Sequence, residues 1–123
     1  MNKIADFIIR YRNSNKKELE LKTTKIGLSL LDVLEKTGYI KYSLVSKTQK
    51  KTIIELKDSR IRGLELISKN SRDIFLTHSD LLSDPKLKST TSFYIMSTSK
   101  LGIISSWEAL TNGIGGKILV RVW

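Results

Sequence analysis

Hydrophobic spacing in the first half of the chain switches from helical to strand periodicity and back, and this pattern restricts the fold more than composition does. Apolar residues recur at i, i+3, i+4 and i+7 over residues 4–11, which predicts an amphipathic helix. Residues 18–22 alternate between polar and apolar side chains, as expected of a half-buried strand. A second helical stripe follows Thr23 and Thr24, either of which can cap it, and ends near Gly38. Two short strands within residues 40–56 complete a helix–strand–helix–strand–strand unit, with two helices on a small sheet.

The second half consists of shorter segments with a strand bias. The candidate strands are residues 64–68, 74–77, 93–96, 103–104 and 117–123, with one helical turn predicted at 79–83. Ser105 followed three residues later by Glu108 predicts a capping box that opens a short helix. We therefore predict an α/β protein with a two-helix, three-strand half (1–57), a polar connector (58–63) and a mostly β half (64–123). Either half would be marginal alone, so we expect them to associate tightly.

The charge balance points to a polyanionic partner. Twenty-two Lys and Arg face twelve Asp and Glu, giving a formal net charge of +10. A small domain this basic usually binds nucleic acid, because each neutralised phosphate releases condensed counterions. An anionic membrane surface and an acidic protein partner are the alternatives. Residues 1–63 carry fifteen basic and seven acidic side chains, whereas residues 64–123 carry seven and five. Charge alone therefore assigns nucleic-acid binding to the first half.

Several chemistries are unavailable or poorly supported. With no cysteine and a single histidine, the chain offers no disulfide, no cysteine-ligated zinc and no two-histidine metal site of its own. No apolar run approaches the ~20 residues of a membrane-spanning helix. The enzymatic alternative is a ribonuclease that uses His78 with Asp80 or Asp84. A lone histidine in a polar stretch is ordinarily a surface residue, so we expect no catalysis, no cofactor and no small-molecule substrate.

The segment from Ser97 to Gly116 has the most specific chemistry. Three small hydroxyl side chains and a lysine follow a predicted strand; they are Ser97, Thr98, Ser99 and Lys100. Hydroxyls and backbone amides bond phosphate oxygens, ribose hydroxyls and base edges, while the lysine adds charge. The adjacent glycines Gly115 and Gly116 allow another backbone to come close. Taken alone, such turns and glycine pairs are more often structural than functional.

The order of these elements resembles the carboxy-terminal signature of the bacterial-type ribosomal protein S8 family. In that family a strand leads into Ser-Thr-Ser-Lys-Gly, then a Glu-Ala helix, Gly-x-Gly-Gly and a last strand that often closes in Val-Trp. The corresponding residues are Ser97–Lys100 with Gly102, Glu108-Ala109, Gly113–Gly116 and Val122-Trp123. The chain departs from the signature by an inserted Leu101, by Asn70-Ser71 in place of a usual Pro-Gly turn, and by Phe75 in place of a usual tyrosine.

The resemblance implies a non-catalytic protein of two tightly associated α/β halves. It would bind a helix of the central domain of small-subunit ribosomal RNA early in assembly, beside neighbouring ribosomal proteins, and it would need no metal. The implied RNA-binding residues are Ser97, Thr98, Ser99, Lys100, Gly115, Gly116, Glu108, Phe75, Arg10, Asn13, Thr24 and Lys25. Three assignments keep structural alternatives. Glu108 is equally consistent with a helix cap, Phe75 with a core residue, and the glycine pair with shaping the last turn.

Composition bears on the compartment. Sixteen Lys against six Arg, with fifteen Ile and only two Ala, is typical of an AT-rich coding genome. Together with the drift from the family signature, this favours a mitochondrial ribosome. A plastid-type organelle and the bacterial cytoplasm are the alternatives.

Overall fold

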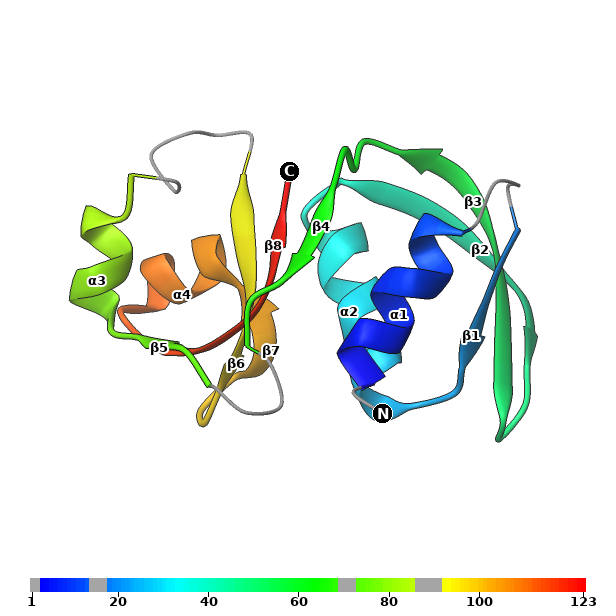
Figure 1. Ribbon diagram of the computed structural model, residues 1–123, viewed down its shortest axis with the longest axis horizontal. Helices are drawn as coiled ribbons and strands as arrows, with labels where there is room; N and C mark the ends of the chain where they lie inside the picture. The colour runs from blue at the N-terminus through cyan, green and yellow to red at the C-terminus, as the bar shows by residue number, and fades with distance from the viewer. Residues whose placement is uncertain (1–2, 14–17, 69–72, 86–91) are drawn as a thin grey trace. The chain divides into compact units, whose positions relative to one another are not determined.

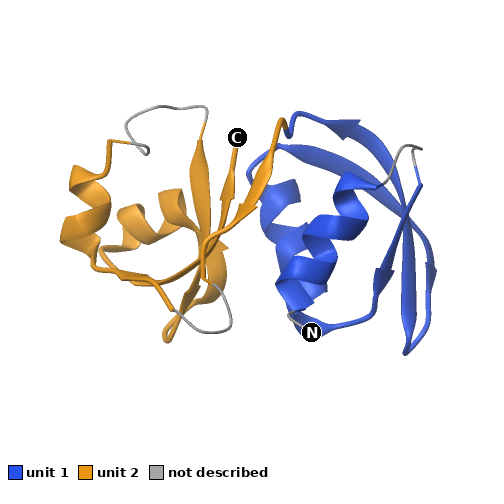
Figure 2. Ribbon diagram, in the orientation of Figure 1, with its two compact units in different colours: residues 1–61 blue, residues 62–123 orange. Residues whose placement is uncertain are grey.

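The computed structural model of the chain describes residues 3–13, 18–68, 73–85 and 92–123. These residues form two compact units, residues 1–61 and residues 62–123, shown in different colours in Figure 2. Each unit contains helices and one antiparallel sheet, so the predicted mixed α/β class is confirmed.

Unit 1 has the element order that hydrophobic spacing predicts (Figure 1). Its elements are α1 (Lys3–Arg12), β1 (Glu18–Lys22), α2 (Lys25–Lys36), β2 (Ile40–Lys47) and β3 (Lys51–Ser59). The three strands form an antiparallel sheet in the order β1-β3-β2, so the last strand of the unit lies in the middle.

The core of unit 1 follows from its two periodicities. The amphipathic stripe of α1 buries Ile4, Phe7 and Ile8, while β1 turns Leu19 and Leu21 inward. The two ends of α2 also behave as predicted: the Thr24 hydroxyl accepts the Gly27 N–H, and Gly38 adopts a left-handed φ of 82° just after the helix.

Unit 2 is built around its last strand. Its elements are β4 (Leu64–Leu66), β5 (Phe75–Leu76), α3 (His78–Ser83), β6 (Phe93–Thr98), β7 (Gly102–Ser105), α4 (Ser106–Asn112) and β8 (Gly116–Val122). The sheet order is β4-β8-β6-β7, and the short β5 also pairs with β8. All of these pairings are antiparallel. The described residues of the predicted mostly β half therefore include two short helices.

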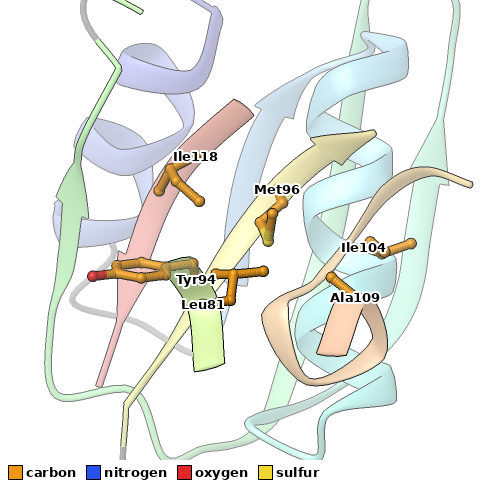
Figure 3. Packing of buried hydrophobic residues seen from close by; sticks show 6 residues of the cluster. All are labelled: Leu81, Tyr94, Met96, Ile104, Ala109 and Ile118. Atoms are coloured by element: carbon orange, nitrogen blue, oxygen red, sulfur yellow. The ribbon is translucent and has the colours of Figure 1, made fainter. Parts of the chain in front are cut away.

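One face of this sheet packs against both helices of unit 2. Buried side chains from α3, α4 and three strands form its cluster (Figure 3): Leu81, Tyr94, Met96, Ile104, Ala109 and Ile118. Because side chains alternate along a strand, the neighbours Ser97 and Lys117 point to the opposite face from Met96 and Ile118. The helices thus occupy one face of the sheet and leave these polar residues on the other.

The structure differs from several of the expected boundaries. β3 runs through Ser59, into the segment assigned to the connector, and the division between units falls after residue 61. The strand expected at 64–68 stops at Leu66, and that expected at 74–77 is reduced to Phe75–Leu76. Trp123, expected as part of the last strand, lies just beyond β8 and is only half-buried. The turn predicted at 69–72 and most of the loop predicted at 84–92 lie outside the described residues.

Candidate nucleic-acid interface

The turn between β6 and β7 is a three-residue hairpin loop tied by one hydroxyl. Thr98 pairs with Gly102, which has a left-handed φ of 70°, an arrangement typical of three-residue hairpin loops. The Thr98 hydroxyl donates to the Gly102 carbonyl (2.9 Å) and accepts the Leu101 N–H (3.1 Å). The inserted Leu101 is accommodated in this way, and Thr98 holds the turn. Ser99 and Lys100 are exposed on it and available to a ligand.

A second feature extends across the sheet from this turn. Ser97 on β6 pairs with Lys117 on β8, and Lys117 pairs on its other side with Phe75 on β5. Directly paired residues project from the same face of a sheet, so these three side chains form a continuous line, which we term the Ser97–Lys117–Phe75 row. Phe75 is 66% exposed, which excludes the alternative that it is a core residue. The row offers a hydroxyl, a cation and an aromatic ring on one surface.

The two glycines are explained by contacts within unit 2. A Cβ on Gly115 would lie closer than 3.0 Å to the Leu76 carbonyl and to the backbone of Thr77. A Cβ on Gly116 would lie closer than 3.0 Å to the Ser97 carbonyl. The close backbone approach inferred from the sequence thus occurs between β8 and its own neighbours. A further approach of RNA to these glycines stays a prediction.

Glu108 takes part in a cap through its backbone and leaves its side chain exposed. The Ser105 hydroxyl accepts the Glu108 N–H (3.2 Å) at the start of α4, which is one of the two hydrogen bonds of the predicted capping box. Gly113 closes the same helix with a left-handed φ of 69°. The Glu108 carboxylate lies on the surface. The structure is therefore compatible with both roles of Glu108, the helix cap and a contact with a ligand.

The four predicted contacts of the first half lie in unit 1 and differ in availability. Arg10 is engaged locally: its Nε lies 3.0 Å from Asp6 Oδ2, and its Nη1 donates to the Glu20 carbonyl at 3.4 Å. Thr24 uses its hydroxyl as the cap of α2. By contrast, Lys25 and Asn13 are exposed at the ends of helices.

Lys117 was not singled out by the sequence analysis. Its position in a predicted strand gives only a face, and the register with β5 and β6 is what places it between Ser97 and Phe75. Lysines are common in this chain, so residue type alone gave no signal.

The residues of the enzymatic alternative have structural partners. The His78 ring Nε2 lies 3.2 Å from the Leu110 carbonyl. The Asp80 carboxylate accepts the Thr77 N–H and completes the capping box of α3; these hydrogen bonds lower the pKa of Asp80. Within the described ranges, no three His, Cys, Asp or Glu side chains are grouped so that they could hold a metal ion. Nor does any helix in that part of the chain have the length and apolarity to cross a membrane.

Comparison with known families identifies the chain. Residues 2–123 match the family model described as ribosomal protein S8. The chain belongs to the ribosomal protein S8 family. This confirms the resemblance seen in the residues from Ser97 to Trp123, and the mixed α/β fold is consistent with that of the S8 family.

Bacterial members of the S8 family align with this chain from end to end. The small ribosomal subunit protein uS8 of Kosmotoga olearia is 32% identical over 133 positions, which cover 98% of this chain and 96% of that protein. The uS8 protein of Mesomycoplasma hyopneumoniae is 34% identical over 128 positions, covering 98% and 95%. That of Ureaplasma parvum serovar 3 is 31% identical over 134 positions, covering 100% and 98%. A ribosomal role is therefore shared by the similar proteins.

Proposed function

We propose that this S8-family chain is a structural component of the small ribosomal subunit that binds a helix of the central domain of its RNA and helps to assemble it. The observation that supports this most directly is the Ser97–Lys117–Phe75 row, which adjoins the exposed Ser99 and Lys100. An exposed aromatic ring beside hydroxyls and cations is the combination that binds unstacked nucleotides. The small-subunit names of the relatives agree with this role.

The side chains divide the recognition task. Ser97 and Ser99 would bond base edges or ribose hydroxyls, and Lys100 would contact a phosphate. Phe75 would stack on an unpaired base. Thr98 acts indirectly in this scheme, because its hydroxyl is used to hold the turn. Glu108 would accept a hydrogen bond from a base or ribose hydroxyl on the exposed surface of α4.

Unit 1 would supply sequence-independent attraction. It contains fourteen basic and seven acidic side chains, and its exposed Lys25 and Asn13 suit phosphate contacts. Arg10 would reach RNA only by giving up part of its contact with Asp6. No catalytic step is part of this proposal, since His78 and Asp80 contribute to the packing and capping of helices.

The test is a binding comparison between two RNAs. One contains the central-domain helix of the cognate small-subunit RNA with its internal loop, and the other has that loop replaced by Watson–Crick pairs. We expect at least tenfold tighter binding of the intact chain to the first RNA, in line with the usual excess of specific over non-specific affinity. Equal affinity for both RNAs would reduce the chain to a general polyanion binder and overturn the proposal.

We also propose that the ribosome concerned is mitochondrial. The Lys- and Ile-rich composition and the inserted Leu101 support this, although the relatives compared above are bacterial. Sedimentation of organelle and cytosol fractions, followed by detection of the chain in the small-subunit peak, is the direct measurement. Recovery in any other compartment would contradict the assignment.

A further inference from the structure

The cation at the centre of the Ser97–Lys117–Phe75 row is paired with a carboxylate of the same unit. Lys117 Nζ lies 3.0 Å from Asp73 Oδ1, and the side chains of the two residues are 33% and 51% exposed. Ser97 and Phe75 lie on either side of Lys117 in the sheet. A lysine between an aromatic ring and a hydroxyl, facing solvent, therefore holds an anionic partner in the free protein.

This partner is held weakly enough to be exchanged. An ion pair between partly exposed side chains contributes about 0–1 kcal/mol, because solvent screens both charges. An RNA phosphate offers Lys117 a charge-assisted hydrogen bond of the same kind and also releases condensed counterions. The exchange of Asp73 for a phosphate would therefore favour RNA binding and cost little in the protein.

The spacing of the row suits a single nucleotide. Paired residues on neighbouring strands are about 5 Å apart, so Lys117 lies one strand away from Phe75. In a nucleotide the phosphate is separated from the base by one ribose. A base that stacks on the exposed ring of Phe75 can thus place its phosphate over the next strand, where Lys117 is found.

We propose that Lys117 binds the phosphate of an unpaired nucleotide whose base stacks on Phe75. In the free protein Asp73 forms an ion pair with Lys117, and the RNA phosphate displaces Asp73 on binding. This inference rests on the RNA binding proposed above, and it adds a cationic contact and an internal competitor. Asp73 then lowers the affinity of the chain for its RNA. Removing a carboxylate at this one position would make binding tighter.

The experiment measures the affinity of four full-length variants for the RNA with the internal loop, over a range of salt concentrations. Lys117→Gln should weaken binding about three- to tenfold and reduce the salt slope by about one phosphate. Lys117→Arg should retain binding. Asp73→Asn should tighten binding about two- to fivefold, as expected from the loss of an exposed ion pair. The double variant should bind like Lys117→Gln alone, since the effects of coupled residues do not add.

The matched control is the ion pair between Lys57 and Glu55 in unit 1, whose atoms are also 3.0 Å apart with both side chains partly exposed. Glu55→Gln removes one negative charge, as Asp73→Asn does, but Glu55 lies outside the row. Equal gains from these two variants, no gain from Asp73→Asn, or a gain that persists without Lys117 would overturn the inference. If the native chain discriminates between the two RNAs while the Asp73 and Lys117 variants behave like it, only this inference fails. If the native chain does not discriminate, the proposed function fails as well.

Discussion

The two units of this S8-family chain have similar architecture and different surface chemistry. Each packs two helices against one face of an antiparallel sheet whose last strand lies in the interior. Unit 1 contains fourteen basic and seven acidic side chains, and unit 2 contains eight and five. The less charged unit nevertheless has the exposed aromatic ring, the tied turn and the hydroxyls. Net charge thus indicates where a polyanion is attracted, while the arrangement of neutral groups indicates where it would be recognised.

The largest expected effect is on stability, and it appears when one glycine from each unit is replaced by alanine. Gly116→Ala in unit 2 should destabilise the protein by about 2–3 kcal/mol, because the new methyl group would collide with the backbone carbonyl of Ser97. Gly27→Ala in unit 1 would place its Cβ 2.9 Å from the Thr24 hydroxyl and 3.6 Å from the Lys22 carbonyl, and it gains about 1 kcal/mol of helix propensity, so we expect a smaller loss. Urea unfolding of both variants measures the difference. A Gly116→Ala protein as stable as the native chain would show that β8 can move away from β6.

The next contrast concerns RNA specificity. Ser99→Ala should weaken binding to the RNA with the internal loop by about 1–3 kcal/mol if its hydroxyl reads a base, and should leave binding to the fully paired RNA unchanged. Lys25→Ala in unit 1 should weaken binding to both RNAs and reduce the salt slope by about one phosphate. Filter binding with the two RNAs at several salt concentrations separates these outcomes. If the two variants lose the same affinity for both RNAs, the proposed distinction between a recognising unit 2 and an attracting unit 1 is wrong.

A smaller effect should follow from loosening the turn. Thr98→Val keeps the shape of the side chain but removes both hydrogen bonds of its hydroxyl, so we expect a loss of about 1–2 kcal/mol in stability. Thermal melting would measure this loss, and RNA binding should fall because Ser99 and Lys100 are no longer held. The counterpart in unit 1 is Thr24→Val, which removes a helix cap worth about 1 kcal/mol. That variant should leave discrimination between the two RNAs unchanged.

The last contrast concerns a titration that takes place only at high pH. Burial and a hydrogen bond to Asp84 raise the pKa of Tyr94 to about 12, so the folded protein holds this proton more tightly than the unfolded chain does. The associated stability is therefore complete below the ordinary tyrosine pKa of 10.0 and is lost as pH rises through about 12. Ultraviolet titration of phenolate should show a late step that disappears in Tyr94→Phe. Tyr42→Phe in unit 1 is the control and should retain the late step. If the late step disappears in that variant, it belongs to Tyr42, and the assignment to Tyr94 is wrong.

Local patterns predicted the elements well, whereas the candidate site depended on long-range pairing. The stripe of α1, a cap at Thr23 or Thr24, the Ser105 cap, and the glycines that end helices at 38 and 113 all follow from residue type at a given spacing. The Ser97–Lys117–Phe75 row does not, because the register between β5, β6 and β8 is set by packing and not by any one segment.

Some side-chain contacts could also be predicted from local spacing, whereas others depend on long-range pairing. The contact of Arg10 with Asp6 was available from the sequence as an i, i+4 pair on a helix, and it limits the role first assigned to Arg10. The direction of the Thr98 hydroxyl and the ion pair of Lys117 with Asp73 depend on how the chain closes, so neither could be predicted from residue order.

The central place of β8 has a consequence for the order of events during synthesis. Three strands made earlier, β4, β5 and β6, pair with β8, and Leu64 meets Val122 almost at the opposite end of the unit's sequence. Contacts this distant along the chain form slowly, and they require the late segment to have emerged. Lys117 itself lies on β8. A nascent or truncated chain that lacks this strand would therefore present no complete row to RNA, so that binding would select fully made protein for assembly.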